Sequence, residues 1–536
     1  MSRGFVDLVP DEVRREWARA GLCPDRDLYA LFSEHCAQNP AKPVVIDEHG
    51  EASYAELDDL ARRIAAGLSG LGVAAGDVVG VQLGNDRWAC AVELALAALG
   101  AVALPYPPGR GDVEAASLLG RAGARVAVVL VEWGDFPCAE RTRALVDRLP
   151  ELEAVVSLGG APDGCTSLEE LARAGERFEP VEHDPDGPAR ILVSSGSEAE
   201  PKMVLYSHNA LAGGRGRFMA ELRVRAPELR NLFLLPLGSS FGAHALPSAV
   251  AAHGGTLVLR PRFDPGAVWV AVERHRPHHV FAVPTMVRRL LDHQEHRDAS
   301  SVRAVVVGGG SLDAVTAQRA AEAFGSAVVN LYGSADGVNC HSDVDGLPAA
   351  DGSVGRPDPR AAEIRVVDEG MRSRSRGEVG EIIARGPMTP MCYVGSPQLD
   401  RTKRADGGWV RTGDAGFLGA DGTLTVVGRR DDVIIRGGLN ISPAQVEGLI
   451  NTMAGVTDAV CVPFTDPSLG ERMCACVTGD VELSLDDIVE HLGQQGLDRR
   501  KFPEDLVVLP RLPLGAAGKV DRGALRHVAE TRAVAS

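Results

Sequence analysis

Short apolar runs alternate with helical patterns from about residue 53 onward. The stretch from Tyr54 to Leu71 repeats its apolar residues at helical spacing, whereas Val78–Leu83, Val126–Val131 and Val155–Leu158 are apolar runs of strand length. Strands and helices in this order are typical of βαβ units. We therefore expect a layered α/β architecture in the larger part of the chain.

The same alternation returns between Arg303 and Gly337. A strand at Ala304–Val307 is predicted to lead into three consecutive glycines, and a helix then runs to Phe324. A second strand, Val328–Leu331, is followed directly by an aromatic residue and a glycine. Ligands of such sheets bind beyond the carboxyl ends of the strands. Both glycine-containing turns are therefore candidate site loops.

The pattern changes after Gly428, where strands and helices become shorter and follow an α+β order. We predict a large N-terminal α/β domain at residues 1–429, a hinge at 430–432, a small mobile α+β lid at 433–526 and a frayed tail at 527–536. Within the lid, Ser442 as N-cap, Pro443 at the first helical position and Gln445 three residues after the cap predict the start of a helix.

Length and charge narrow the classes of function. A chain of 536 residues is too long for one hydrophobic core, because cores stop growing beyond about 250–300 residues. The formal charge of −17 argues against nucleic acid or an anionic membrane as a partner, since clustered Lys and Arg hold such partners. The run from Ala89 to Pro105 contains Glu93 and Gly100, so we interpret it as a buried helix leading into a strand.

The ten cysteines form no Cys-x-x-Cys pair, and the chain has no recognisable signal peptide. This usage is typical of reduced thiols in a cytoplasmic protein, so we assign no disulfide and no zinc. Cys474 and Cys476 alternate along a predicted strand and are expected to face the same side.

One loop carries residues suited to phosphate. It joins two apolar strands, ends in Pro201-Lys202, and contains Ser194, Ser195, Gly196, Ser197 and Glu198. Backbone N–H groups and hydroxyls in such a loop can surround a phosphate. A plain hairpin loop is equally consistent with these residues, because Ser and Gly are common in turns.

Further motifs follow this loop in a fixed order. They are Val283-Pro284-Thr285-Met286, Gly308-Gly309-Gly310-Ser311-Leu312, Tyr332-Gly333-Ser334-Ala335-Asp336, Thr412-Gly413-Asp414, Gly428-Arg429-Arg430-Asp431-Asp432 and Gly515-Ala516-Ala517-Gly518-Lys519. In this order they resemble the motif series of the adenylate-forming superfamily, which contains acyl-CoA synthetases, nonribosomal-peptide adenylation domains and beetle luciferases. The resemblance covers about residues 27–526.

The resemblance implies a reaction in two steps. Members first make an acyl-adenylate from a carboxylate and MgATP, and then rotate the small domain so that a thiol can attack. The implied nucleotide residues are Gly309, Gly310, Ser311, Tyr332, Gly333 and Ser334 around adenine, Asp414 for the ribose hydroxyls, Arg429 for ribose or phosphate, and Asp336 for Mg²⁺. The role implied for Asp414 is chemically suitable, because a carboxylate can accept hydrogen bonds from two ribose hydroxyls.

The resemblance also assigns the catalytic and thiol-binding residues. Asp431 corresponds to the hinge, and Lys519 to the catalytic lysine that stabilises charge on the carboxylate and α-phosphate. Gly437 and Gly438 would line the pantetheine tunnel, since two glycines leave room against bare backbone; a tight turn is the alternative. The implied acyl pocket comprises Ser239, Ser240, His244, Gly308 and Val338.

Three departures from the family pattern fall on the side of the triphosphate and carboxylate. Glu198-Ala199 replaces the usual Thr-Gly, with Glu200 nearby; Asp336 replaces a Glu, and Ser239 replaces a His. A carboxylate about 5 Å from a phosphate costs roughly 3 kcal/mol at an effective dielectric constant of about 20. We therefore expect weak or absent adenylation together with retained thioester formation.

The predicted function is transfer of an acyl group from an acyl-adenylate to CoA, for which a separate adenylating enzyme would be a partner. The alternatives are a complete ligase that uses ATP and Mg²⁺, an enzyme that loads a carrier protein, and a catalytically inactive binding protein. The motif after the hinge is similar to that of the ligases of aryl and cyclic acids, which favours CoA over a carrier protein as the acceptor. The chain also resembles ligases of actinobacterial biosynthesis, among which a non-adenylating type occurs. The acid stays unidentified; small residues in the implied pocket favour a bulky, largely apolar one.

Overall fold

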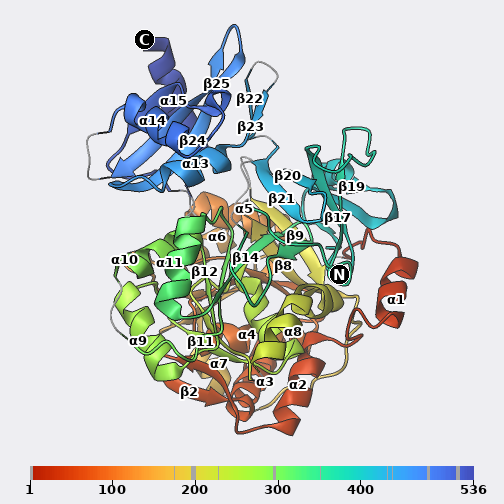
Figure 1. The fold of residues 1–536 in the computed structure, drawn as a ribbon. Coiled ribbons are helices and arrows are strands. Elements are labelled where there is room, and N and C mark those ends of the chain that lie inside the picture. The colour runs from red at the N-terminus through yellow and green to blue at the C-terminus, as the bar shows by residue number, and fades with distance from the viewer. Residues whose placement is uncertain are drawn as a thin grey trace.

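A computed structural model describes residues 4–173, 176–194, 201–226, 228–293, 297–349, 352–430, 432–436, 439–479, 483–514 and 520–535. The larger part contains layered sheets and helices, and a smaller part formed by the C-terminal residues lies at one end of it (Figure 1). This is the α/β arrangement predicted from the alternating pattern.

The first sheet confirms the early strands of the sequence analysis. Within the described residues it has eight strands in the order β18-β9-β8-β4-β3-β5-β6-β7. They are β3 (Val78–Gln82), β4 (Val102–Pro105), β5 (Ala124–Leu130), β6 (Ala154–Leu158), β7 (Thr166–Ser167), β8 (Pro188–Ser194), β9 (Lys202–Ser207) and β18 (Cys392–Tyr393). The strands from β4 to β7 are parallel, whereas β8 and β9 form an antiparallel pair around the predicted phosphate loop.

The second sheet brings the glycine turns together. Among the described residues it has eight strands in the order β15-β14-β13-β12-β10-β11-β1-β2. They are β1 (Pro43–Asp47), β2 (Gly50–Ser53), β10 (Arg230–Phe233), β11 (Thr256–Leu259), β12 (His279–Ala282), β13 (Ala304–Gly308), β14 (Ala327–Ser334) and β15 (Val338–His341). Because β13 and β14 are parallel neighbours, the turns after both strands lie at the same edge.

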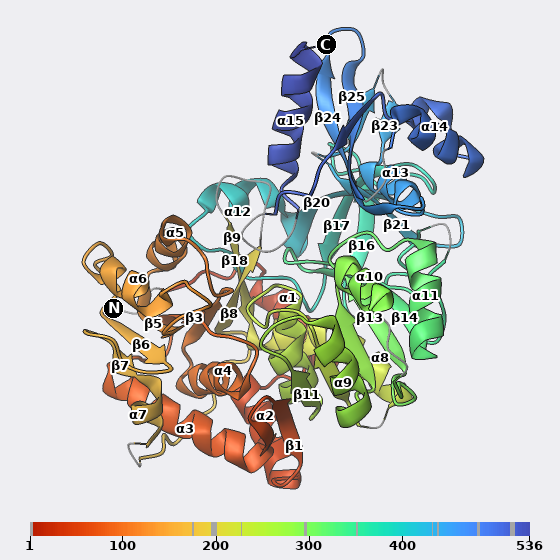
Figure 2. The ribbon, with the colours of Figure 1, turned by 90° about the vertical axis from the view of Figure 1, so that its left-hand side faces the viewer.

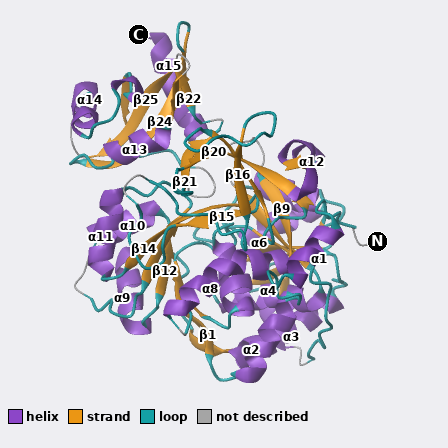
Figure 3. Cartoon of the chain, turned by 45° about the vertical axis from the view of Figure 1, so that its right-hand side comes forward, coloured by secondary structure: helices purple, strands orange, loops and turns teal. Residues whose placement is uncertain are grey.

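Helices cover the faces of these sheets. They include α1 (Asp11–Arg19), α2 (Leu28–Gln38), α3 (Tyr54–Gly70), α4 (Arg87–Leu99), α5 (Asp112–Ala122), α6 (Cys138–Val146), α7 (Leu168–Arg173), α8 (Gly216–Arg225), α9 (Pro265–His275), α10 (Pro284–Asp292), α11 (Ala314–Phe324) and α12 (Pro397–Lys403). Phe281 belongs to the apolar cluster that includes residues of α8, whereas its neighbour Val280 belongs to the cluster that includes residues of α9. The two helices therefore cover opposite faces of β12 (Figure 3).

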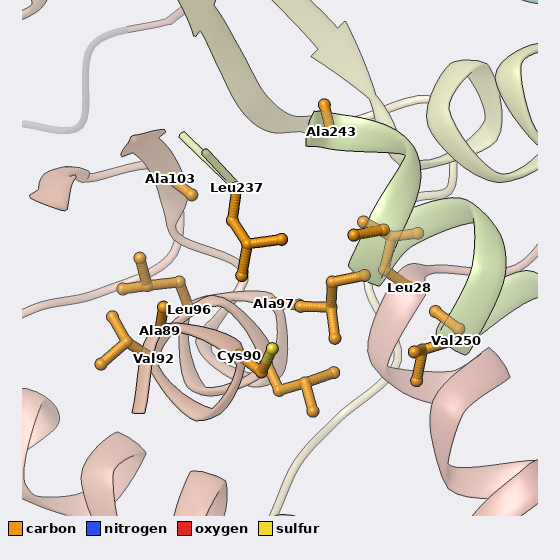
Figure 4. Close-up of a cluster of buried hydrophobic side chains, with 14 of the residues drawn as sticks. Leu28, Ala89, Cys90, Val92, Leu96, Ala97, Ala103, Leu237, Ala243 and Val250 are labelled. Carbon is orange, nitrogen blue, oxygen red and sulfur yellow. The ribbon is translucent and has the colours of Figure 1, made fainter. Parts of the chain in front are cut away.

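The core of the larger part centres on α4, which is buried from Ala89 to Leu99. Figure 4 shows Leu237, from the chain after β10, lying over the face of α4 that carries Ala89 and Leu96. The apolar run that contains this helix continues into β4, as predicted. None of the described helices is both long and apolar enough to span a membrane.

A third sheet contains the strand that carries the Thr412-Gly413-Asp414 motif. It has five antiparallel strands among the described residues: β16 (Glu363–Val367), β17 (Gly380–Arg385), β19 (Arg404–Ala405), β20 (Trp409–Leu418) and β21 (Leu424–Arg429). The register of β20 and β21 pairs Asp414 directly with Arg429. Two motifs separated in sequence thus become cross-strand neighbours.

The C-terminal part contains a fourth sheet, and its helix Pro443–Ile450 contacts β21 (Figure 2). Its elements are β22 (Ile434–Arg436), β23 (Leu439–Ile441), α13 (Pro443–Ile450), β24 (Val456–Asp466), β25 (Gly470–Gly479), α14 (Leu485–Gln494), β26 (Asp505–Val508) and α15 (Arg522–Ala535). The Ser442 hydroxyl accepts from the Gln445 N–H, which confirms the predicted helix start. Cys474 and Cys476 face one side of β25, in a single apolar cluster.

The end of the chain differs from the expectation. Residues 527–535 belong to α15 and are not a frayed tail. Leu525 and Ala529 are four residues apart, so they lie on one face of the helix, and both are fully buried against β24 and β25. This apolar contact stabilises the terminal helix through tertiary packing, which could not be predicted from its many charged residues.

Candidate functional site

The turn after β13 is built around glycine. A Cβ atom on Gly308 would lie 2.8 Å from the Leu331 carbonyl oxygen and 3.0 Å from the ring of Phe241. Gly309 has φ +77°, a conformation that other residues rarely adopt. Gly309, Gly310 and Ser311 are exposed, so this edge of the sheet presents bare backbone to a ligand.

Asp414 lies at the centre of a hydrogen-bonded group beside this turn. The Tyr332 hydroxyl donates to its Oδ2 at 2.6 Å, and the Arg429 Nε lies 3.1 Å from its Oδ1. Burial raises the pKa of Asp414, whereas Arg429 and the Tyr332 hydroxyl oppose that rise. Each carboxylate oxygen keeps a second lone pair, so the carboxylate can still accept ribose hydroxyls.

The carbonyl of Thr412 connects this group to a lysine. It accepts from Arg429 Nη1 and from Lys403 Nζ, both at 3.1 Å. Gly413 has φ +77°, and a Cβ atom there would lie 2.8 Å from Lys403 Nζ. Two features therefore favour glycine at position 413 of the Thr-Gly-Asp motif: the backbone conformation there and the lysine ammonium packed against it.

Asp336 is the predicted Mg²⁺ residue, and it is only 2% exposed. The Tyr393 hydroxyl donates to its Oδ1 at 2.6 Å, and the Ser334 hydroxyl donates to its Oδ2 at 3.1 Å. Among the described residues, no group of three His, Cys, Asp or Glu side chains could hold a metal. Mg²⁺ often uses one or two carboxylates plus substrate phosphates. A metal here would therefore have to share Asp336 with two internal donors.

Three of the predicted acyl-pocket residues, Ser239, Ser240 and His244, follow β10, and a fourth, Gly308, ends β13. The Ser239 hydroxyl accepts from the Gly242 N–H at 2.9 Å, and the Ser240 carbonyl accepts from Arg215 Nη2 at 2.8 Å. His244 is buried, and burial together with Arg215 lowers its pKa to about 3. Its Nδ1 lies 3.0 Å from the Phe241 carbonyl oxygen, so Nδ1 carries the proton and Nε2 is an acceptor.

Polar groups deeper in the fold hold this segment in place. Asn85, in the loop before α4, donates to the Leu235 carbonyl at 2.8 Å and accepts from the Leu237 N–H at 2.9 Å. Arg190 is ion-paired with Glu93 and donates to the Leu237 carbonyl at 2.6 Å. The backbone of the candidate acyl pocket is thereby anchored to the first sheet.

A model of the AMP-binding enzyme family matches residues 32–394 of this chain, which include the phosphate loop and the turns after β13 and β14. The chain belongs to this family. The matched residues include Gly308–Ser311 and Tyr332, two of the motifs whose order resembled the adenylate-forming superfamily, and Tyr332 bonds to Asp414 beyond the matched range.

Similarity to known proteins extends over nearly the whole chain. The chain is 31% identical to the 2-hydroxy-7-methoxy-5-methyl-1-naphthoate–CoA ligase of Streptomyces carzinostaticus, over 98% of this chain and 97% of that one. It is 30% identical to the salicyl-AMP ligase / salicyl-S-ArCP synthetase of Mycobacterium tuberculosis, over 97% and 94%. The anthranilate CoA ligase AuaEII in complex with anthranoyl-AMP shares the fold, with TM-score 0.84 at 22% identity, over 95% and 99%.

These likenesses assign the protein to the acyl- or aryl-CoA ligases and adenylating enzymes of the superfamily. Ser194 and Lys202, which border the phosphate loop, are direct cross-strand partners in β8 and β9. Several predicted residues lie outside the described residues: Ser195, Gly196, Ser197, Glu198, Ala199, Glu200, Asp431, Gly437, Gly438 and Lys519.

Val338 has different surroundings from the other predicted acyl-pocket residues. It is 1% exposed and lies in an apolar cluster with Met388 and Leu424, against which Tyr332 packs. Gly333 precedes it across the β14–β15 turn, and a Cβ atom on Gly333 would lie 3.5 Å from the Val338 carbonyl. The structure thus groups Val338 with the nucleotide residues rather than with His244.

Sequence reasoning did not single out Lys403, Tyr393, Arg215 or Asn85. Tyr393, Arg215 and Asn85 bond to the site from segments at least 25 residues away, and none of the four residues belongs to a motif. Lys403 stands nine residues before Thr412, so its position near the Thr-Gly-Asp motif was the one available signal.

Proposed function

We propose that this enzyme forms an acyl-CoA thioester from an acyl-adenylate and CoA, and that its own adenylation step is weak or lost. The acidic residues of the phosphate loop, Glu198 and Glu200, carry the proposal. Asp414, at the ribose end, and Asp336, at the metal end, are both buried, and each is engaged at both carboxylate oxygens. Each carboxylate also keeps further lone pairs for a ligand.

The phosphate loop places negative charge where the triphosphate of ATP would bind. Glu198 and Glu200 stand between Ser194 and Lys202, where ATP would place its β- and γ-phosphates. Repulsion of about 3 kcal/mol per close contact would weaken ATP binding by about two decades. An acyl-adenylate keeps only one phosphate, so it avoids most of this repulsion.

The acyl group is proposed to be an aryl or cyclic acid. Relatives named for naphthoate and salicylate span nearly the full chain. In the candidate pocket, the ring of Phe241 lies against Gly308, which leaves an apolar surface at the end of β13. CoA and the AMP moiety of the adenylate are then the ligands, and a separate adenylating enzyme supplies the substrate. ATP and Mg²⁺ are required only to the extent that adenylation is retained.

The C-terminal residues have roles that rest on the motifs. We propose residues 430–432 as the hinge, with Asp431 absorbing the rotation, and residues 433–526 as the lid. Gly437 and Gly438 are proposed to line the path of pantetheine, and Lys519 to serve adenylation. In the structure, Arg288 of α10 lies 3.1 Å from Asp458 of β24, a contact between the two parts that a rotation would break.

A comparison of CoA with a carrier protein as the thiol acceptor tests the proposal. We expect the purified protein, given a preformed aryl-adenylate, to release AMP and form a thioester with CoA. A holo carrier protein should give at least about tenfold less thioester at equal thiol concentration, which corresponds to about 1.4 kcal/mol. Product is measured by mass spectrometry, with apo carrier, which lacks the phosphopantetheine thiol, as a blank. Preferential loading of the carrier would instead make the protein a carrier-loading enzyme.

Restoring the loop should restore ATP use. In the double variant Glu198→Thr with Ala199→Gly, removal of one carboxylate and recovery of a flexible glycine should raise acid-dependent ATP–pyrophosphate exchange at least about tenfold. Glu369→Thr is the matched control, because Glu369 is an exposed loop residue that already precedes Gly370. Equal exchange by the wild type, the double variant and the control would show that the loop is not the limiting defect.

A further inference from the structure

Lys403 is a half-buried lysine that no motif of the family includes. It ends α12, and its ammonium donates to the Thr412 carbonyl at 3.1 Å. A Cβ atom on Gly413 would lie 2.8 Å from its Nζ. The lysine is therefore held directly beside Asp414, the proposed ribose residue.

Positive charge is concentrated around this lysine. Lys202 from β9 lies within hydrogen-bonding reach of Lys403, and Arg429 shares the Thr412 carbonyl with it. Burial lowers the pKa of Lys403, Lys202 and Arg429 lower it further, and Asp336 opposes them. Three cations thus face two carboxylates, Asp336 and Asp414.

The two carboxylates are already engaged. Asp414 is paired with Arg429, and Asp336 accepts from Tyr393 and Ser334. No ion pair within 4 Å joins Lys403 to an acidic side chain in the part of the chain that the structure describes. Two neighbouring ammonium groups repel each other at partly buried positions, and an anion that contacts both would relieve that repulsion.

We propose that Lys403 binds the phosphate of the acyl-adenylate, opposite Lys202. The inference rests on the proposed nucleotide site, because Asp414 then fixes the ribose and leaves the 5′-phosphate to lie toward the two lysines. Lys403 would hold the single phosphate that remains after adenylation as a point charge. This would preserve adenylate binding in an enzyme whose triphosphate loop has become acidic.

A comparison of two adenosine ligands tests the role of Lys403. AMP carries a charged 5′-phosphate, whereas 5′-O-sulfamoyladenosine has a similar shape without that charge. By calorimetry, Lys403→Gln should weaken AMP binding by about 10- to 30-fold and change sulfamoyladenosine binding by less than about threefold. Lys403→Arg, which keeps the charge, should bind AMP within about threefold of the wild type.

Arg401→Gln is the matched control, because Arg401 lies on the same helix, is exposed and bonds only to Gln398 in the described structure. Equal weakening of both ligands in Lys403→Gln would assign the lysine to holding the Thr412–Asp414 turn and overturn the proposal. Unchanged AMP binding would also overturn it. If Lys403→Gln does not fold, loss of AMP selectivity in Lys403→Arg overturns it. Binding is measured without turnover, so failure to form a thioester would leave this result intact.

Discussion

Replacing Asp414 with Ala should weaken AMP binding by about 100-fold. The carboxylate is the one acidic group that β20 presents beside the glycine turn, and it is expected to accept two ribose O–H bonds. Hydrogen bonds to a charged acceptor contribute about 1.5–3 kcal/mol each, and the Tyr332 hydroxyl would also lose its acceptor. Calorimetry with AMP measures the effect directly.

Asp421→Ala is the control for this prediction. Asp421 lies in the turn that joins β20 to β21, where it is exposed and bonds to Thr423. Its loss should leave AMP binding within about twofold, because a surface interaction of this kind contributes little. If Asp414→Ala binds AMP as well as Asp421→Ala does, Asp414 does not hold the ribose.

Much of the site edge could be predicted from the sequence. The apolar run at Ala304–Val307, the glycines after it and the following helix define a parallel βα unit, and such units place their loops at one edge of the sheet. Gly309 was predictable as a site residue for the same reason that the structure shows, since its φ of +77° suits glycine.

Contacts between distant segments could not be predicted in this way. Tyr332 and Asp414 are 82 residues apart, and Tyr393 and Asp336 are 57 apart. Such pairs depend on how three sheets pack against one another, which local periodicity does not encode. The terminal helix was missed for a related reason, because only the buried face that includes Leu525 stabilises it.

The two half-reactions should differ by at least about a hundredfold in the wild-type enzyme. Three departures from the family pattern are expected to weaken the binding of ATP, metal and carboxylate, namely Glu198 with Ala199, Asp336 and Ser239. The groups expected to hold the adenylate, Asp414 and Tyr332, remain in hydrogen-bonding geometry. Two decades correspond to about 2.7 kcal/mol, which one unfavourable charge contact in the loop would supply.

Lys519→Ala separates this account from a general loss of activity. The resemblance assigns Lys519 to the adenylation arrangement, so its removal should abolish residual ATP–pyrophosphate exchange. Thioester formation from supplied adenylate should persist within about threefold, because the lysine is not expected to act in that step. Equal loss of both reactions in Lys519→Ala would show that one arrangement of the lid serves both.

The central claim is tested most directly by measuring acyl-CoA formation by the unmodified protein from two sets of substrates. One reaction contains preformed acyl-adenylate and CoA, and the other contains the free acid, ATP, Mg²⁺ and CoA. We predict rapid acyl-CoA formation in the first reaction and little in the second. Comparable rates in both reactions would contradict the account and make the protein a complete ATP-dependent ligase.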